Sequence, residues 1–187
     1  MTQTGGGHMQ ASRATSGEQP APRERKRNPF TKSAGGGRAL SAVMLPLFTI
    51  WPPRGFGVLT TTGRRTGKTR RKCVRVVRRG DEAYLVMLGP ALTGQAGPKV
   101  VAAWLWNIRA DPNVRLRIRG GTFAGSAREI EEGPEKERAR QAYCETVHTF
   151  DYIECDFHTS GWPTSAKVQR MHRHWFNTGI PLVIELL

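Results

Sequence analysis

The residues with the clearest chemistry surround a short segment, Gly-Arg-Arg-Thr-Gly-Lys at residues 63–68, between two β-prone runs at 58–62 and 73–77. Nine cationic side chains and no carboxylate occupy residues 64–79. Arginine forks bind phosphate or carboxylate in pairs of hydrogen bonds. Two glycines permit a positive φ, which lets backbone N–H groups converge on an anion. The pattern predicts a docking site for a polyanionic small molecule; the alternative is a solvated basic hairpin.

The net positive charge of the chain indicates an anionic partner, but the charged residues are unevenly distributed along the sequence. The net charge is +14, while residues 129–156 hold nine of the fifteen acids. A uniformly basic protein that coats DNA would not segregate charge in this way. A nucleic-acid binder that uses residues 23–27 with the 64–79 cluster remains an alternative, with affinity that falls steeply as salt rises. Few aromatic residues lie among these arginines, which argues against it.

Other catalytic or metal-binding patterns are weak. No triad or carboxylate pair stands out, and the late Cys and His residues match no common zinc spacing, so we expect no metal site. Three distant cysteines form no disulfide framework and predict a reducing compartment. Residues 1–38 contain no apolar signal-peptide core. We therefore expect a cytoplasmic protein.

The helices and strands expected around the basic segment form one domain, which is preceded by a tail. Residues 1–37 have the composition of a disordered basic tail, and residues 38–187 of a folded domain. The pattern predicts an apolar helix at 40–51, followed by strands at 58–62, 73–77 and 83–88 and a loop at 89–98. After the loop it predicts a helix at 99–109 and a hairpin at 114–130. Two further helices, one from 134 and one over 165–175, precede a last strand at 180–187. Residues 149–179 give no clear signal apart from the helix at 165–175. Short connections favour an α+β fold, a mostly antiparallel barrel with flanking helices.

Three strings together resemble the deazaflavin-dependent nitroreductase family. They are Leu-Thr-Thr-Thr-Gly-Arg-Arg-Thr-Gly-Lys-Thr-Arg at 59–70, Ala-Trp-Leu-Trp-Asn-Ile-Arg-Ala-Asp-Pro-Asn-Val at 103–114, and Trp175 ahead of Ile-Pro-Leu-Val-Ile at 180–184. The likeness covers roughly residues 38–187. It implies a split β-barrel of the flavin-reductase type that uses coenzyme F420, with flavin mononucleotide (FMN) as the alternative cofactor.

The resemblance also implies a set of site residues. The phosphate and oligoglutamate tail of the coenzyme would be held by Arg64, Arg65, Thr66, Gly67, Lys68 and Arg70. The deazaflavin ring would lie near Met87, Leu88, Gly89, Trp104 and Asn107, with Trp106 as a further wall. Proton donors to a reduced substrate would be His172, Tyr143 and Tyr152. For Trp104 and Met87 the alternative is ordinary core, and for His172 it is a surface position.

This chain departs from the family after its third strand. It has Leu-Gly-Pro-Ala at 88–91, where relatives commonly place Ser-Lys/Asn-Gly-Gly near the ring. Fewer polar ring contacts imply a more apolar pocket.

The resemblance implies an enzyme that passes a hydride from reduced F420 to an electron-poor small molecule, such as a quinone, a nitroaromatic or an enone. Two alternatives stay open: a non-catalytic or altered-ligand barrel that binds lipid, FMN or haem, and the nucleic-acid binder. The apolar segment at 39–51 allows contact with an anionic membrane, at the inner face of the plasma membrane. The sequence leaves the oligomeric state open.

Overall fold

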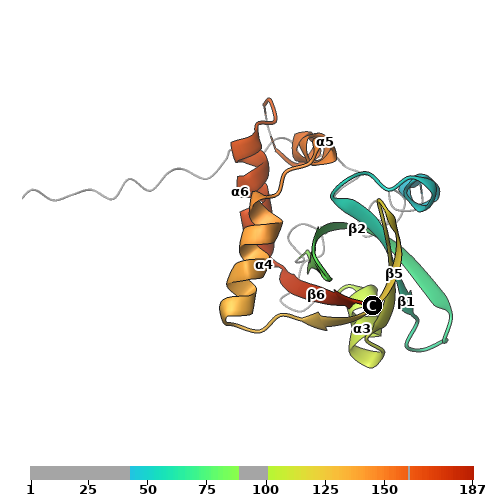
Figure 1. Ribbon diagram of the computed structural model, residues 1–187. Helices are drawn as coiled ribbons and strands as arrows, with labels where there is room; N and C mark the ends of the chain where they lie inside the picture. The colour runs from blue at the N-terminus through green and yellow to red at the C-terminus, as the bar shows by residue number, and fades with distance from the viewer. Residues whose placement is uncertain (1–42, 89–100, 160) are drawn as a thin grey trace, which may run out of the picture.

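The computed structural model describes residues 43–88, 101–159 and 161–187. The predicted tail at 1–37, the loop at 89–98 and the site residue Gly89 lie outside the described residues. Six strands form a closed antiparallel barrel in the order β1-β2-β3-β6-β5-β4 (Figure 1). They are β1 Phe56–Thr62, β2 Thr69–Arg79, β3 Glu82–Met87, β4 Asn113–Ile118, β5 Gly121–Glu129 and β6 Ile180–Leu186. The expected α+β class with a mostly antiparallel barrel is confirmed.

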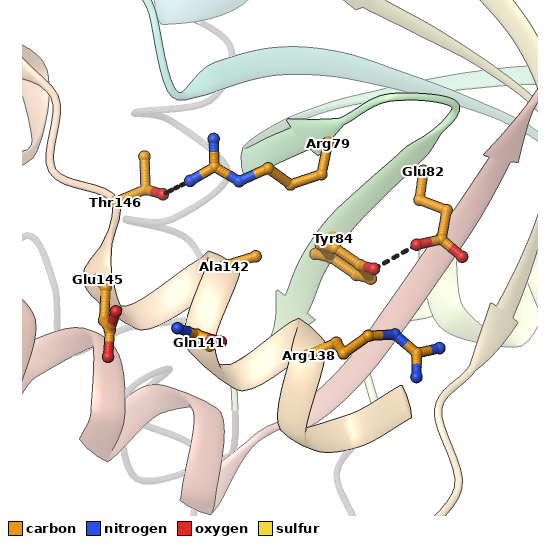
Figure 2. Close-up of a pocket in the computed structure, with 8 residues that line it drawn as sticks. All are labelled: Arg79, Glu82, Tyr84, Arg138, Gln141, Ala142, Glu145 and Thr146. Carbon is orange, nitrogen blue, oxygen red and sulfur yellow. Dashed lines mark hydrogen bonds between the residues drawn. The ribbon is translucent and has the colours of Figure 1, made fainter. Parts of the chain in front are cut away.

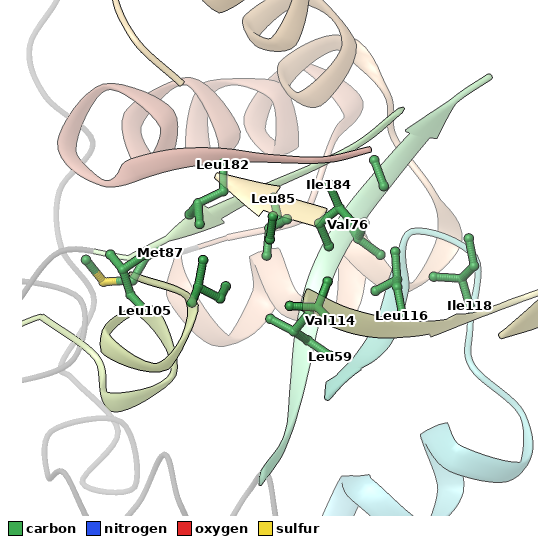
Figure 3. Close-up of a cluster of buried hydrophobic side chains, with 13 residues drawn as sticks. Leu59, Val76, Leu85, Met87, Leu105, Val114, Leu116, Ile118, Leu182 and Ile184 are labelled. Atoms are coloured by element: carbon green, nitrogen blue, oxygen red, sulfur yellow. The ribbon is translucent and has the colours of Figure 1, made fainter. Parts of the chain in front are cut away.

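Alternation along each strand sends one set of side chains into the barrel and the other set outward. The inward set forms an apolar core that includes Leu59, Leu85, Leu105, Leu116 and Leu182 (Figure 3). β4 shows the pattern most cleanly: Val114, Leu116 and Ile118 are buried, and the arginines between them point outward. Leu105 comes from a helix, so a helix contributes to the core beside the strands.

Helices cover part of the barrel and close one end of it. They are α3 Ala103–Ala110, α4 Pro134–Glu145, α5 Thr149–His158 and α6 Ser165–Thr178, and residues 43–50 are also helical. α4 and α6 stand side by side on one flank, with α5 near the end of α6 (Figure 1). Their packing makes a second apolar layer around Val77, Tyr84, Tyr143 and Phe176 on the outside of the barrel.

Three of the sequence predictions need correction. The helix predicted at 99–109 begins only at Ala103, because Ala102 is extended (φ −62°, ψ 143°) and acts as its N-cap. β2 is longer than the predicted 73–77, because residues 69–72 pair with β1. α5 was not predicted. It begins at a capping box in which the side chain of His148 and the carboxylate of Asp151 exchange hydrogen bonds with each other's backbone N–H groups.

Candidate functional site

The basic turn at residues 63–68 is a tightly hydrogen-bonded unit between β1 and β2. The N–H of Gly63 donates to the carbonyl of Lys68 over 2.9 Å, and the N–H groups of Thr66 and Gly67 donate to the carbonyl of Gly63 over 3.0 and 2.7 Å. Gly67 has φ +63°, a conformation that favours glycine. The turn is therefore ordered by its own backbone.

This ordering corrects the expectation that N–H groups of the turn converge on an anion. Those of Thr66 and Gly67 are directed at the carbonyl of Gly63, and that of Arg64 donates to Oδ1 of Asn107 over 3.1 Å. These three donors are thus occupied inside the protein. The side chains of Arg64, Arg65, Lys68 and Arg70 are exposed and remain available for contact with an anion.

Helix α3 holds the turn in place through Asn107. Its side chain is 7% exposed, and while Oδ1 accepts from Arg64, Nδ2 donates to Oγ1 of Thr61 over 3.1 Å. One amide therefore joins the end of β1, the turn and α3. Asn107, which the resemblance assigns to the coenzyme, contacts the backbone of the basic turn in this structure.

Trp106 provides a second link between the turn and the barrel. The guanidinium carbons of Arg64 and Arg109 lie 5.6 and 4.8 Å from its ring centroid. Arg109 in turn makes a two-pronged ion pair with Glu129 of β5, over 2.6 and 3.1 Å. Cation–π contacts at exposed sites contribute about 0.5–1 kcal/mol each. Trp106 thus steadies Arg64, a role that the sequence did not indicate.

The residues expected around the deazaflavin ring fall into two groups. Met87 is 3% exposed and lies in the barrel core, and Trp104 packs half-buried on that core. Leu88 is half-buried and packs on two apolar clusters. Tyr143 belongs to one of them, and Tyr152 packs on the other. The structure therefore brings Leu88, Tyr143 and Tyr152 into one region and keeps Met87 and Trp104 with the core.

Arg75, which the sequence groups with the basic cluster, is instead buried beneath the helices. Its Nε donates to Asp151 of α5 over 3.0 Å, and its Nη1 and Nη2 donate to the carbonyls of Tyr143 and Thr146 over 3.2 and 2.8 Å. Nη2 also lies 3.1 Å from Nδ1 of His172. Arg75 therefore ties the end of α4, α5 and α6 to β2.

His172 and Tyr143 belong to this buried cluster. Burial, together with the nearby Arg75, lowers the pKa of His172 to about 3, so its ring is neutral and Nδ1 can accept from Arg75. Burial likewise raises the pKa of Tyr143 to about 12. Because His172 is 0% exposed, the alternative of a surface histidine is wrong. The side chains of His172 and Tyr143 are therefore both buried next to Arg75.

Two buried polar atoms in the same region have no hydrogen-bond partner among the described residues: Nε2 of His172 and Oε2 of Glu154. Burial raises the pKa of Glu154 to about 7; Arg75 opposes that shift and Asp151 adds to it. Sequence reasoning missed both Asp151 and Glu154. The only available signal was their spacing of three residues, which places them on one face of a helix once α5 is known.

Two pockets lined by described residues lie away from the basic turn. The larger, about 450 Å³, lies between β2, β3 and α4 (Figure 2). It is lined by Arg79, Glu82, Tyr84, Arg138, Gln141, Ala142, Glu145 and Thr146. The second, about 230 Å³, lies beside Trp51. The part of the chain that the structure describes contains no group of three or more His, Cys, Asp or Glu side chains that could hold a metal ion.

Comparison with known families gives one clear result. A family model described as F420H2-dependent quinone reductase matches residues 47–159, which is more than half of the chain. The match contains the basic turn, Asn107 and Asp151. No curated protein matches the chain.

Solved structures with a similar arrangement share little sequence with this chain. One is described as a domain-swapped dimer, with 21% identity and TM-score 0.46, over 71% of this chain and 81% of that chain. An F420-H2 dependent reductase has 20% identity and TM-score 0.44, over 71% and 95%. A putative pyridoxamine 5'-phosphate oxidase from Listeria innocua has 16% identity and TM-score 0.38, over 79% and 93%.

Proposed function

Because the chain belongs to the F420H2-dependent quinone reductase family, and is therefore an F420-dependent oxidoreductase, we propose that it transfers a hydride from reduced F420 to a quinone-type acceptor. The observation that carries the proposal for this chain is the basic turn, fixed by Asn107 with its cationic side chains exposed. Nitroaromatic and enone acceptors share the electron-poor character of a quinone and are the finer alternatives.

The side chains of the turn fit the coenzyme. F420 carries a phosphodiester and several carboxylates, and the turn offers Arg64, Arg65, Lys68 and Arg70 with no acid in the same stretch. An exposed ion pair contributes only about 0.2–1 kcal/mol. Several such contacts are therefore needed, and a long acidic tail uses more of them than the single phosphate of FMN would.

When bound, the reduced deazaflavin supplies a hydride, and a quinone that takes it up together with one proton becomes a hydroquinone. The chain's own part is to orient the two molecules and to exclude water. Asn107 and Trp106 keep the turn in position for the tail. Among the three candidate proton donors, Tyr152 has the best placement, because it is half-buried near Leu88 while His172 and Tyr143 are enclosed around Arg75.

The proposal is tested by following oxidation of F420H2 with menadione as acceptor, and by titrating the oxidised coenzyme, FMN and haem into the protein. We expect turnover with menadione and tighter binding of F420 than of FMN. Binding of FMN or haem in preference to F420, with no turnover of F420H2, would show the altered-ligand barrel instead.

Substitutions in the turn test the assignment of the tail site. Arg65→Gln and Lys68→Gln should each raise the KM for F420H2 about 1.4- to 5-fold with kcat unchanged, the effect of losing one exposed ionic contact. Asn107→Ala should raise this KM further, because it frees the turn and not just one charge. Arg170→Gln and Asn177→Ala, both exposed on α6, are the matched controls. Equal effects in the controls, or a lower kcat with unchanged KM in the turn variants, would contradict the assignment.

A further inference from the structure

Helix α4 lines the larger pocket, of about 450 Å³, with one of its faces. Six of the twelve residues of α4 are charged, and none of the described helices is long and apolar enough to cross a membrane. Arg138, Gln141, Ala142 and Glu145 line the pocket at the i, i+3, i+4, i+7 spacing of a single helix face. This wall of the pocket therefore carries a cation towards one end and an anion towards the other.

Strands β2 and β3 form the opposite wall and add one further charge of each sign (Figure 2). Arg79, the last residue of β2, donates from Nη2 to Oγ1 of Thr146 over 2.8 Å. On β3, the hydroxyl of Tyr84 donates to Oε2 of Glu82. Burial and the neighbouring Glu82 raise the pKa of Tyr84 to about 12, so the hydroxyl keeps its proton and holds that carboxylate in place.

The charged side chains of this pocket differ from their neighbours because they have no ionic partner. Elsewhere on this flank, ion pairs join Lys136 to Glu132, Arg140 to Glu137, and Arg128 to Glu135. Between described residues, no ion pair involves the four charged side chains that line the pocket, which are Arg79, Glu82, Arg138 and Glu145. Two cations and two anions thus face one cavity without neutralising each other by contact.

We propose that this pocket binds a small zwitterion, a dipeptide or a free amino acid that carries both an ammonium and a carboxylate group. Arg138 binds the carboxylate through its guanidinium fork, and Glu145 accepts hydrogen bonds from the ammonium group. Seven residues of helix separate these two side chains by about 10 Å along the axis. An extended dipeptide, at about 3.5 Å per residue, covers most of that span, and the two long side chains supply the rest.

The balance of charge and polarity argues against other classes of ligand. A polyanion such as a nucleotide would meet Glu82 and Glu145, and a polycation would meet Arg79 and Arg138. An apolar ligand would remove water from four charged groups without replacing the lost hydrogen bonds. The charges that line the pocket sum to zero, so a zwitterion is the class that satisfies both signs. The volume lies within the usual range for small-molecule sites, about 300–1,000 Å³.

Thr146 connects this pocket with the buried cluster around Arg75. Its Oγ1 accepts from Arg79 inside the pocket, and its carbonyl accepts from Nη2 of Arg75 over 2.8 Å. A ligand in the pocket therefore lies beside the residue at which α4 ends. Its binding should slow amide hydrogen exchange over residues 146–151, which lead from α4 into α5.

Calorimetric titration of the full-length protein with the common L-amino acids and a panel of Ala-Xaa dipeptides tests the proposal. We expect at least one dipeptide to bind with a Kd of about 1 mM or lower. N-acetylation and C-terminal amidation of that dipeptide should each weaken binding about fivefold, because each removes one ionic contact. Hydrogen exchange with the bound dipeptide should show the protection over residues 146–151.

Substitutions identify which side chain holds which end of the ligand. Arg138→Gln and Glu145→Gln should each weaken binding about fivefold. Amidation of the dipeptide should have no further effect on Arg138→Gln, and acetylation none on Glu145→Gln, since the partner of the masked group is already absent. The matched control is Arg140→Gln, exposed on the same helix and paired with Glu137. It should bind like the wild type, and all three variants should keep the F420H2–menadione activity.

Four results would overturn the proposal. One is absence of binding by every amino acid and dipeptide at about 10 mM, and another is equal binding of the free and the charge-masked dipeptides. The third is tighter binding of a dicarboxylate such as succinate than of any zwitterion. The fourth is a loss of affinity in Arg140→Gln as large as in Arg138→Gln, or protection from exchange outside residues 146–151 alone, which would place the ligand elsewhere.

Discussion

Arg75 and Glu154 show how much the helical side of the protein depends on single ionisable residues. Arg75 donates to a carboxylate and to two backbone carbonyls in a region that is closed to water. Removing one partner of such a buried pair typically costs about 3–5 kcal/mol, because the remaining charge is left without compensation. Glu154, in contrast, has a buried oxygen without a partner. It is therefore the residue at which protonation should affect stability.

Glu154→Gln tests this at the residue scale. The folded state raises the pKa of Glu154 from 4.5 to about 7, so it keeps a proton that the unfolded chain loses in this window. The free energy of unfolding that this group contributes is thus present below pH 4.5 and is lost as pH rises through 7, by up to about 3 kcal/mol. Denaturant unfolding should show the Gln variant more stable than the wild type at pH 8 and similar to it at pH 5.

The control for this experiment is Glu145→Gln, an exposed carboxylate of α4. His172, whose pKa is lowered to about 3, makes both proteins less stable as pH falls below 6.5, so its effect cancels in the comparison. A difference between Glu154→Gln and wild type that does not change with pH would contradict the raised pKa.

The sequence could not reveal the role of Arg75 or Asp151. Arg75 stands in a strand with cations at six of eleven positions, and nothing in the sequence separates the one that faces α4 to α6 from those that face solvent. That distinction comes from which face of β2 the helices cover. By contrast, the position of the basic turn between two strands could be predicted from the spacing of its glycines and from its charge. The resemblance assigns Asn107 to the coenzyme, which stays a prediction, and its contact with the turn could not be inferred without the fold.

At the scale of elements, strands with clear alternation and short connections were predictable, and β4, β5 and β6 lie within one or two residues of their expected bounds. α5 was not, because it buries Asp151 while Ile153 and Phe157 are exposed, the reverse of the usual pattern, and its N-cap is a histidine instead of a Ser, Thr, Asp or Asn. The order of the strands in the barrel was not predicted, because β6 pairs with β3 and β5, both distant in the chain.

Gly125→Ala tests the seam between β5 and β6. A Cβ there would lie 2.5 Å from the carbonyl oxygen of Glu185 and 2.8 Å from Cγ2 of Ile184, so the two strands must separate. Overpacking of this kind costs about 1–3 kcal/mol, and we expect the free energy of unfolding to fall by that amount. Ser126→Ala, exposed on the same strand, is the control. If thermal and denaturant unfolding place both variants together, the seam tolerates a side chain and this interpretation is wrong.

For the molecule as a whole, the separation of charge sets how the enzyme should respond to salt. The net charge is +14, and the described basic residues lie mainly on the turn and the β1-β2-β4 surface. Because exposed charges are screened over about 8–10 Å at 0.1–0.15 M salt, raising NaCl from 50 to 300 mM should increase the KM for F420H2 several-fold. The KM for menadione, which is neutral, should not change.

A variant with Arg64→Gln and Arg65→Gln should show a flatter dependence of the F420H2 KM on salt, since fewer ionic contacts are screened. The same series of salt concentrations addresses the remaining alternative from the sequence. If the protein bound DNA at 150 mM NaCl more tightly than F420, and lost that affinity steeply at higher salt, the basic surface would serve nucleic acid instead of the coenzyme.

The position of β6 in the barrel has a consequence for synthesis of the protein. β6 fills the gap between β3 and β5, although it is the last strand to be made. While it is still inside the ribosome, the nascent chain presents two unpaired strand edges, which can associate with other chains. Ring closure is then a late event that joins segments about a hundred residues apart, and chaperones that shield such edges should matter most in the moments around release.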